Sequence, residues 1–456
     1  MSMTTDDTTP APPRRLRYPA LVEMIILGGI ALVLMLALSM IHSLVLERAS
    51  RARAARAEIA ASWGQSQILG GPVLIVPYRV RYISAGKILE AKHHAHFLPD
   101  RLVARGRLLP ERRHRGIFET VLYRAQLRVE GEFARPDFSG WDVAPTDILW
   151  NEAILTVGVS DLRGIGGNPV MQWNGGALKF SGGSGNPRLW ASGLTASNPF
   201  PGGPTAARYP FAMNLSLNGS EHISFYPLGR ETVVELTSPW PDPSFSGAFL
   251  PQSRRITDQG FSARWSISSL ARSYPQQWRT NDEPDFGTSL VPSAFSVGLF
   301  SPVSHYQQAE RSVKYGALFI VLTFVTFFLY ELLSPVSLHP VQYFLVGGAL
   351  CVFYVLLLSI SEHAPFGMAY AIASVATVSL ITMYGAALLK SALRVAGLAA
   401  VLAMLYGYLY VLLQLEDWAL LMGSIGLFLI LALVMYATRR VDWGTAHLGF
   451  AREKEA

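Results

Sequence analysis

Charged residues and cysteine are scarce in this 456-residue chain. Only 15% of its residues are Asp, Glu, Lys or Arg, whereas soluble domains average about 25%. Together with a mean hydropathy of +0.28, this scarcity excludes an ordinary soluble protein, a disordered chain and a coiled coil. The single cysteine, Cys351, lies in an apolar run. An intramolecular disulfide is therefore impossible, and the polar part of the chain depends on packing for its stability.

The scarcity of charge is concentrated in the C-terminal third of the chain. Only seven of the 125 residues from Lys314 to Thr438 are charged, whereas the residues before Lys314 have an ordinary polarity. Apolar segments of this length require a lipid environment. The sequence therefore predicts a polytopic membrane protein, an α-helical bundle that carries one large polar domain.

Apolar runs long enough to cross a bilayer as helices occur at six places. The first, residues 20–46, follows a tail that contains Arg14, Arg15 and Arg17. It is longer than the hydrophobic region of a signal peptide and has no Ala-x-Ala cleavage site, so we interpret it as an uncleaved signal anchor. The other five candidate spans are residues 313–333, 341–360, 368–389, 395–413 and 418–436.

The distribution of Lys and Arg predicts the orientation in the membrane. Three segments are basic: the tails 1–19 and 437–456 and the loop Lys390–Arg394. Basic loops stay in the cytoplasm, so we expect both termini in the cytoplasm and residues 47–312 in the periplasm of a Gram-negative bacterium. Six basic residues beside the spans oppose this orientation, namely Arg48, Arg51, Arg53, Arg56, Arg311 and Lys314. A long domain is nevertheless translocated despite flanking charge.

The polar region is predicted to be a helical stalk followed by an all-β, sandwich-like domain. Residues 47–64 are rich in Ala, Arg and Glu, which favour a helix, and Gly64 is suited to ending it. Beyond Gly64, apolar residues recur at every second position, as in Val121–Phe133, which is typical of half-buried strands in antiparallel sheets. The segment 181–204, rich in Gly, Pro and Ser, is either a long loop or a boundary between two lobes, 65–180 and 205–312.

A tight turn is predicted at Asn218–Gly219. Apolar residues alternate before this dipeptide, from Phe211 to Leu217, and again after it, at Ile223 and Phe225. Asn and Gly adopt positive φ readily, as a two-residue type I′ turn requires. The pattern therefore favours a β-hairpin centred on this pair.

Several longer phrases of the sequence match one family. They are Asn218–Pro251, His305–Gly316, His339–Gly347, Ser359–His363 and Leu412–Phe428. Through these phrases the chain resembles the CreD family of inner-membrane proteins, of the cell-envelope integrity class, from about Gly64 to Asp442. The resemblance implies a bacterial inner-membrane protein connected with envelope stress. It implies no reaction and no catalytic residue.

The segment Lys92–Arg115 carries a net charge close to the net +6 of the whole chain. Its seven basic residues are Lys92, Arg101, Arg105, Arg107, Arg112, Arg113 and Arg115, and its only acidic residues are Asp100 and Glu111. Outside the membrane, such a patch is suited to anionic lipid headgroups or another envelope polyanion. The alternative is a sheet edge that its charge protects from aggregation. Aromatic residues do not alternate with these charges, so nucleic acid is not expected.

Ionisable residues beside the spans form a second candidate site, for docking of the polar domain on the helices. They are Arg311, Lys314, Glu362, His363, Glu416 and Asp417. The acidic residues lie in two loops predicted on the same side of the membrane, where they would form one rim beneath the β domain. The basic residues would then contact this rim.

Neither a metal site nor a cofactor is expected. His94 and His96 lie on one face of a predicted strand, with His93 opposite, but a metal requires at least a third ligand. Other Cys and His residues lack suitable spacing, and the chain has no P-loop and no Gly-x-Gly-x-x-Gly. No nucleophile lies beside a base in the sequence, so no catalytic residue is assigned.

These features favour a non-enzymatic protein of envelope integrity or stress response, with the β domain as a binding or sensing surface. The expected partners are the lipid bilayer, anionic lipid or envelope polymer, and other envelope proteins. The alternative is a membrane transporter or lipid-handling protein, in which the five-helix bundle provides a path and the domain delivers or receives cargo.

Overall fold

The chain folds into two compact units, one helical and one of β-sheet. The computed structural model describes residues 20–84, 87–282, 289–299, 305–333, 339–389, 391–415 and 418–439. The helical unit comprises the residues up to Ser50 and from Val303 onward, and the β unit comprises Arg51–Pro302. Helix α1 (Ala20–Trp63) contributes to both units as one uninterrupted helix of 44 residues.

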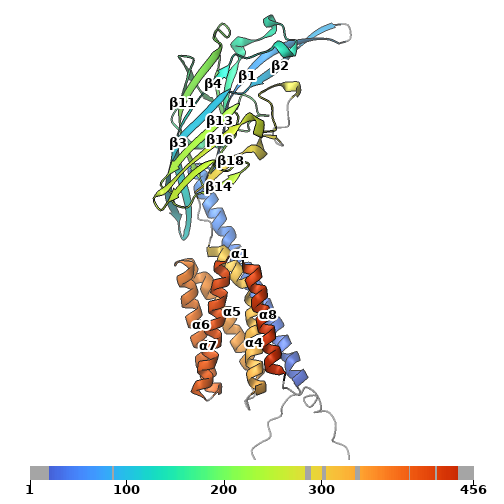
Figure 1. Ribbon diagram of the computed structural model, residues 1–456, viewed down its shortest axis with the longest axis vertical. Coiled ribbons are helices and arrows are strands. Elements are labelled where there is room, and N and C mark those ends of the chain that lie inside the picture. The colour runs from blue at the N-terminus through green and yellow to red at the C-terminus, as the bar shows by residue number, and fades with distance from the viewer. Residues whose placement is uncertain are drawn as a thin grey trace, which may run out of the picture. The chain divides into compact units, whose positions relative to one another are not determined.

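The helical unit contains several helices apolar enough to cross a membrane (Figure 1). Besides α1, the helices are α3 (His305–Lys314), α4 (Gly316–Leu333), α5 (Pro340–Ser361), α6 (Phe366–Leu389), α7 (Ala392–Gln414) and α8 (Ala419–Thr438). By length and composition, four of the described helices are candidate spans, namely α1, α5, α6 and α7. Helices α4 and α8 are also apolar, over shorter described stretches.

Small residues and aromatic rings pack the helical unit. Gly347 of α5 lies against Leu34 of α1, because a Cβ added at Gly347 would come within 2.1 Å of the Leu34 Cδ1 atom. The ring of Phe353 packs edge-on against Tyr406 of α7, with centroids 4.8 Å apart. The Tyr370 hydroxyl of α6 donates a hydrogen bond to the Tyr406 carbonyl at 2.7 Å. These contacts join α1, α5, α6 and α7, and close packing at small residues is typical of membrane helices.

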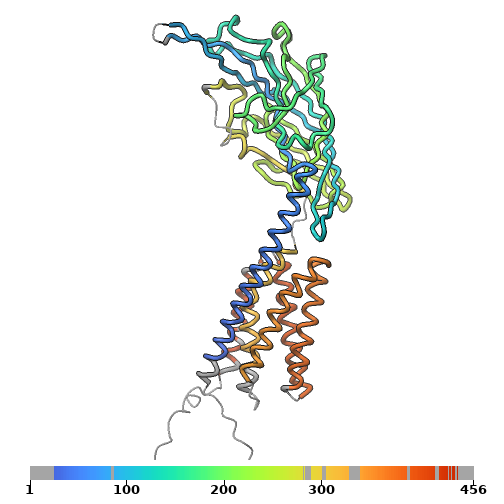
Figure 2. The backbone as a smooth tube through the Cα atoms, turned by 180° about the vertical axis from the view of Figure 1, so that it is seen from behind, coloured from blue at the N-terminus to red at the C-terminus, as the bar shows by residue number. Residues whose placement is uncertain are grey.

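The β unit contains two sheets, and Figure 2 traces the course of its backbone. The first sheet has the order β14 (Ser244–Gly247), β18 (Phe295–Gly298), β12 (His222–Phe225), β1 (Gln67–Ser84), β5 (Ile154–Val159), β10 (Gly193–Ser197) and β9 (Ser181–Gly182). Beside this path, β2 (Lys87–Phe97) pairs with β1, and β17 (Gln277–Arg279) pairs with β2. Strands from both sides of the segment 181–204 are therefore hydrogen-bonded in this sheet.

The second sheet carries the strands that later form the candidate site. Its order is β15 (Ser253–Thr257), β16 (Gly260–Ser268), β13 (Glu231–Ser238), β3 (Arg101–Arg115), β4 (Phe118–Ala134), β11 (Arg208–Ser220), β7 (Val170–Trp173) and β8 (Gly176–Lys179), with β6 (Ile165–Gly166) beside β11. All of its pairings are antiparallel except that of β13 with β3, which is parallel. This parallel pair places the start of β13 beside the start of β3, and so fixes which polar residues are neighbours on the outer face.

One hydrophobic core joins the two sheets. It includes Leu74 and Phe295 of the first sheet and Leu127 and Trp265 of the second. The Trp265 and Phe295 rings meet across the core with centroids 5.6 Å apart. Alternation along β16 buries every second residue, as half-buried strands require. The expected combination of apolar helices with a large two-sheet β region is therefore confirmed.

The prediction of a hairpin at Asn218–Gly219 is wrong. Both residues belong to β11 and pair with β4, Asn218 opposite Arg124 and Gly219 opposite Tyr123. The chain reverses no strand here but crosses from the second sheet to the first through Glu221, which takes the positive φ of 59°. The packing requires a residue as small as glycine at position 219, because a Cβ there would lie 2.4 Å from the Tyr123 hydroxyl oxygen. The Asn-Gly signal thus reflected close packing and not a turn.

Candidate anion-binding face of the second sheet

The predicted basic patch is divided between the two sheets. Lys92 lies on β2 of the first sheet, whereas the six arginines all lie on β3 of the second, which spans Arg101–Arg115. The structure therefore separates Lys92 from the remaining residues of the predicted patch. Along β3 the arginines extend from one end of the strand to the other, so they do not form a single cluster either.

Most of the predicted basic residues are already neutralised. Five of the seven make ion pairs: Lys92 with Glu152, Arg105 with Glu130 and Glu235, Arg112 with Glu119, Arg113 with Glu111, and Arg115 with Glu58. Such exposed pairs add little stability, but each carboxylate cancels a charge that would otherwise attract an anion. Only Arg101 and Arg107 make no ion pair with any residue that the structure describes.

Arg107 belongs to a row of four exposed polar residues on adjacent strands. The register places Arg107 of β3 beside Thr237 of β13, Thr237 beside Ser262 of β16, and Ser262 beside Arg255 of β15. All four side chains are exposed, and residues directly opposite each other point to the same face of a sheet. We call these four residues the arginine row. At about 4.8 Å between strands, its two arginines are roughly 14 Å apart at their Cα atoms.

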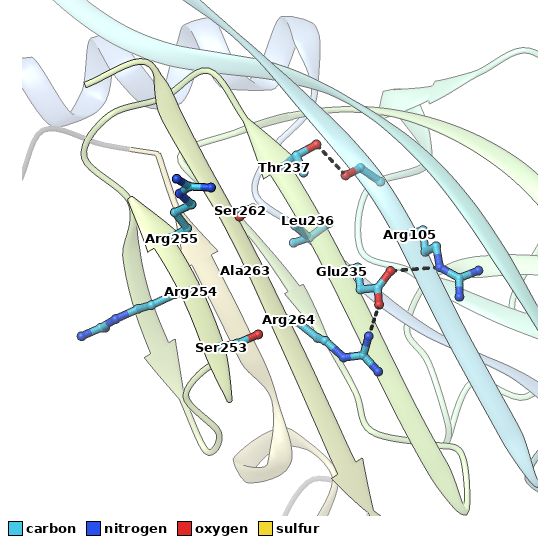
Figure 3. A pocket seen from close by; sticks show the side chains of 11 residues that line it. Arg105, Glu235, Leu236, Thr237, Ser253, Arg254, Arg255, Ser262, Ala263 and Arg264 are labelled. Carbon is cyan, nitrogen blue, oxygen red and sulfur yellow. Dashed lines mark hydrogen bonds and ion pairs between the residues drawn. The ribbon is translucent and has the colours of Figure 1, made fainter. Parts of the chain in front are cut away.

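In the neighbouring row on the same face, two arginines share one carboxylate, as Figure 3 shows. Glu235 accepts hydrogen bonds from Arg105 Nε at 2.9 Å and from Arg264 Nη1 at 2.6 Å. Arg128 and Arg105 also donate hydrogen bonds to Glu130, and these bonds lower the pKa of its carboxyl. Each of these arginines is therefore in an ion pair, whereas Arg107 and Arg255 of the arginine row make no ion pair with any described residue.

The arginine row lies in a shallow groove of about 510 Å³. Its lining includes Arg107, Thr237, Ser262 and Arg255, together with the turn at Gln259. The Thr237 hydroxyl donates a long hydrogen bond of 3.4 Å to the Gly106 carbonyl. Guanidinium groups bind phosphate or carboxylate oxygens through pairs of parallel N–H donors, and the Ser262 hydroxyl can supply a further donor. The groove is thus suited to an anion with more than one charged group.

Reasoning from the sequence missed Arg255, which completes this row. Arg107 and Arg255 are far apart in the chain, and the β13–β3, β13–β16 and β15–β16 pairings together bring their strands into one sheet. A partial signal was present, because the turn Asp258–Gln259 follows the exposed run Ser253–Thr257 and precedes the alternating strand β16. That pattern predicts the β15–β16 hairpin but not its position beside β3.

Two of the predicted docking residues, Glu362 and Lys314, make side-chain contacts inside the helical unit. Glu362 accepts a hydrogen bond from the Tyr306 hydroxyl at 3.0 Å and lies 3.9 Å from Arg48. Lys314 pairs with Glu310 at 2.8 Å and lowers the pKa of that carboxyl. Arg311 is on α3, and His363 follows α5. Glu416 and Asp417 lie outside the described residues, so the docking of domain on helices remains a prediction.

Among the histidines of β2, His96 is buried and packed against other side chains. His96 is 1% exposed, its ring stacks on Trp278 with centroids 4.9 Å apart, and its Nε2 atom lies 2.9 Å from the Asn186 amide nitrogen. Burial lowers the pKa of His96 to about 3, with repulsion from His94 as a second cause. Among the described residues, no group of three or more His, Cys, Asp or Glu residues is placed to hold a metal ion.

A serine and a histidine that are distant in sequence meet at the start of β1. The Ser66 hydroxyl lies 3.2 Å from His222 Nδ1 and 3.0 Å from the Ser220 carbonyl oxygen. Among the described residues, His222 has no carboxylate partner to orient it as the base of a catalytic triad would be. The contact therefore links the entry of β1 to the connection between β11 and β12.

Comparison with known proteins identifies the family. A family model described as "Inner membrane protein CreD" matches residues 19–444. The chain is also 34% identical to "Inner membrane protein CreD" of Escherichia coli (strain K12) over 433 residues, 94% of each protein. The chain belongs to the CreD family. CreD is an inner-membrane protein by description, and the apolar helices of this chain agree with that location.

Among solved structures, a match was found with an M1 zinc metallopeptidase from Deinococcus radiodurans. The match covers 44% of this CreD-family chain and 42% of the peptidase chain, which is less than half of the peptidase. The TM-score is 0.20 and the sequence identity is 9%. These values are too low to relate the two folds, so the peptidase says nothing about the arginine row.

Proposed function

We propose that this CreD-family protein binds phosphate-bearing lipids or polymers of the bacterial envelope through the arginine row and thereby serves envelope integrity without catalysing a reaction. One observation carries the proposal. Arg107 and Arg255 are exposed and make no ion pair among the described residues, and two exposed hydroxyl groups lie between them on the same face. The neighbouring Arg105, Arg128 and Arg264 are held in ion pairs, so the unpaired arginines of this row would attract an anion more strongly.

The proposal includes six membrane spans, α1 and α4 to α8, with both termini in the cytoplasm and the β unit in the periplasm. The basic tails and the loop Lys390–Arg394 support this orientation. Basic residues beside the β unit oppose it, but Arg48 lies 3.9 Å from Glu362 and Lys314 pairs with Glu310. Each of these pairs weakens the opposing charge.

The orientation is tested with single cysteines in intact spheroplasts. Replacement of the only native cysteine, Cys351→Ser, provides the background. Leu270→Cys, at a position 95% exposed in the β unit, should react with a membrane-impermeant maleimide. Ser391→Cys, between α6 and α7, should react only after permeabilisation. The reverse pattern would exclude a periplasmic β unit.

The binding proposal is tested with the full-length protein in phosphatidylcholine nanodiscs. One arm measures binding to vesicles of equimolar phosphatidylcholine and phosphatidylglycerol, and the other measures binding to soluble inorganic polyphosphate. Loss of two charge-assisted contacts in Arg107→Gln/Arg255→Gln should weaken binding about tenfold or more and reduce its salt dependence. A lipid ligand would give the effect mainly in the first arm, and a polymer would give it in the second.

The control removes the same charge from other positions. In Arg101→Gln/Arg254→Gln, Arg101 lies at the far end of β3, and Arg254 pairs with Ala263, which faces the core. Arg254 therefore points away from Arg255, as Figure 3 shows. This variant should bind both probes nearly as well as the original protein. Equal losses in the two variants would show nonspecific attraction and would contradict a site at the arginine row.

A further inference from the structure

The end of the β1–β2 hairpin is a two-stranded ribbon. Strand β5 pairs with β1 only as far as Ile75. Strand β17 pairs with β2 only at Ala95–Phe97, which lie outside the ribbon. Among the described residues, positions 79–84 and 87–92 pair only with each other. Figures 1 and 2 show this ribbon extending from the other strands of the β unit.

Two pairs of apolar, exposed residues lie near the described end of the ribbon, directly inside its last described pair, Ser84–Lys87. Tyr82 is opposite Leu89, and Ile83 is opposite Ile88. Their exposed fractions are 48% for Tyr82, 42% for Leu89, 78% for Ile83 and 72% for Ile88. Such a concentration of large apolar side chains at the end of a projecting hairpin is costly in water, and it is typical of a surface that contacts an apolar partner.

The apolar residues cover both faces of the ribbon. Successive residues of a strand point to opposite faces, so the pair Tyr82–Leu89 lies on one face and the pair Ile83–Ile88 lies on the other. A groove on a folded protein would cover one face and leave the other in water. A bilayer surrounds an inserted tip on all sides, so it satisfies both faces at once.

The charges near the tip favour anionic headgroups. Lys87 lies beside the apolar pairs, opposite Ser84, and Arg79 lies further along the ribbon. Neither makes an ion pair among the described residues, whereas the one acidic residue of this part, Glu90, is paired with Arg81 at 2.9 Å. Basic side chains are attracted to anionic lipid surfaces, and a tyrosine ring is suited to the interface between headgroups and acyl chains.

We infer that the two apolar pairs of the β1–β2 ribbon, Tyr82–Leu89 and Ile83–Ile88, enter the interfacial layer of a phospholipid bilayer with anionic headgroups. The two apolar pairs extend over about 7 Å of strand, which matches the depth of about 5–10 Å reached by interfacial elements. Deeper insertion is prevented, because the outer edges of the ribbon carry unpaired backbone groups that require water. The inference is independent of the arginine row, which lies on the other sheet.

Insertion is tested with the full-length protein in phosphatidylcholine nanodiscs, mixed with vesicles of equimolar phosphatidylcholine and phosphatidylglycerol. Ile83→Thr/Ile88→Thr retains β-branched side chains, which suit a strand, and removes apolar surface. We expect roughly tenfold less protein to float with the vesicles. The control Leu250→Thr/Leu270→Thr removes two other exposed apolar side chains, 65% and 95% exposed, and should float like the original protein.

A direct measurement of depth separates insertion from attraction by charge. In the Cys351→Ser background, Ile83→Cys carries an environment-sensitive fluorophore, and Leu270→Cys carries the same fluorophore as the control. Addition of vesicles should shift the emission to the blue only for the label at position 83. An unshifted label at position 83 on bound vesicles, or unchanged flotation of Ile83→Thr/Ile88→Thr, would overturn the inference. Failure of Arg107→Gln/Arg255→Gln to weaken binding would contradict only the arginine row.

Discussion

Tyr123 of the second sheet donates a hydrogen bond to the carbonyl oxygen of His222 in the first sheet, at 2.9 Å. The Tyr123 side chain is 1% exposed, and burial raises the pKa of its hydroxyl. Its ring lies against Gly219, immediately before the chain crosses between the sheets. One tyrosine thus fixes both the packing of β11 on β4 and the start of β12.

This contact predicts that Gly219→Ala destabilises the β unit. The added Cβ would lie 2.4 Å from the Tyr123 hydroxyl oxygen, so the ring must move and the hydrogen bond to His222 is strained. We expect the free energy of unfolding to fall by about 1–3 kcal/mol, measured from the urea midpoint of the β-sheet circular dichroism of the full chain in detergent. The control is Gly140→Ala, where a Cβ meets nothing within 4 Å. Equal midpoints for the two variants would refute the role of Tyr123.

His96 predicts a specific loss of stability in acid. Its pKa in the folded chain is about 3 because of burial, whereas an unfolded histidine has a pKa of about 6.5. Below pH 6.5 the unfolded chain therefore binds a proton that the folded chain does not, and stability falls by about 1.4 kcal/mol for each pH unit until the pH approaches 3. Above pH 6.5, His96 is neutral in both states, so it causes no loss of stability there.

The test compares urea midpoints at neutral pH and near pH 4. His96→Phe retains a ring that stacks on Trp278 but cannot be protonated, so its midpoint should depend less on pH than that of the original protein. His114→Gln, at an exposed position of β3, should retain the original dependence. A His96→Phe midpoint as sensitive to acid as the original would show that other groups cause the acid unfolding.

The arginine row predicts that loss of a nearby carboxylate strengthens anion binding. Glu235 holds Arg105 Nε at 2.9 Å and Arg264 Nη1 at 2.6 Å on the same face. In Glu235→Gln these cations lose their counter-charge beside the row, so affinity for polyphosphate should rise about threefold to tenfold at low salt, with a steeper salt dependence. Glu152→Gln, which releases Lys92 on the other sheet, serves as the matched control. An unchanged or lower affinity of Glu235→Gln would contradict the proposed site.

The sequence predicted local periodicity well, because periodicity depends on neighbouring residues alone. The alternation within Val121–Phe133 corresponds to β4, and the apolar runs correspond to helices. Ion pairing could not be predicted in this way. Arg105 is neutralised by Glu235, which a parallel pairing brings beside it from a distant part of the chain. Charge counts along Lys92–Arg115 therefore overstated the free charge of that segment.

The same limit explains the missed arginine and the incorrect turn. Arg255 joins Arg107 only after three pairings have aligned four strands, and no local pattern records that alignment. Asn218–Gly219 has the composition of a turn, but its glycine accommodates the ring of Tyr123, which is on another strand. In both cases a tertiary contact determined the role of the residue.

Adjacent glycines on α5 provide the last prediction, for the helical unit. A Cβ at Gly347 would lie 2.1 Å from Leu34 Cδ1 of α1, whereas a Cβ at Gly348 meets nothing within 4 Å. Gly347→Val should therefore separate α1 from α5 and lower the thermal midpoint of the protein in detergent, at a cost of about 1–3 kcal/mol. Gly348→Val adds the same side chain one position away, toward open space, and should change the midpoint little. The two variants introduce the same residue at adjacent positions of the helix. A similar fall of the thermal midpoint in both would therefore show that helix propensity, and not contact with Leu34, sets the requirement for glycine at position 347.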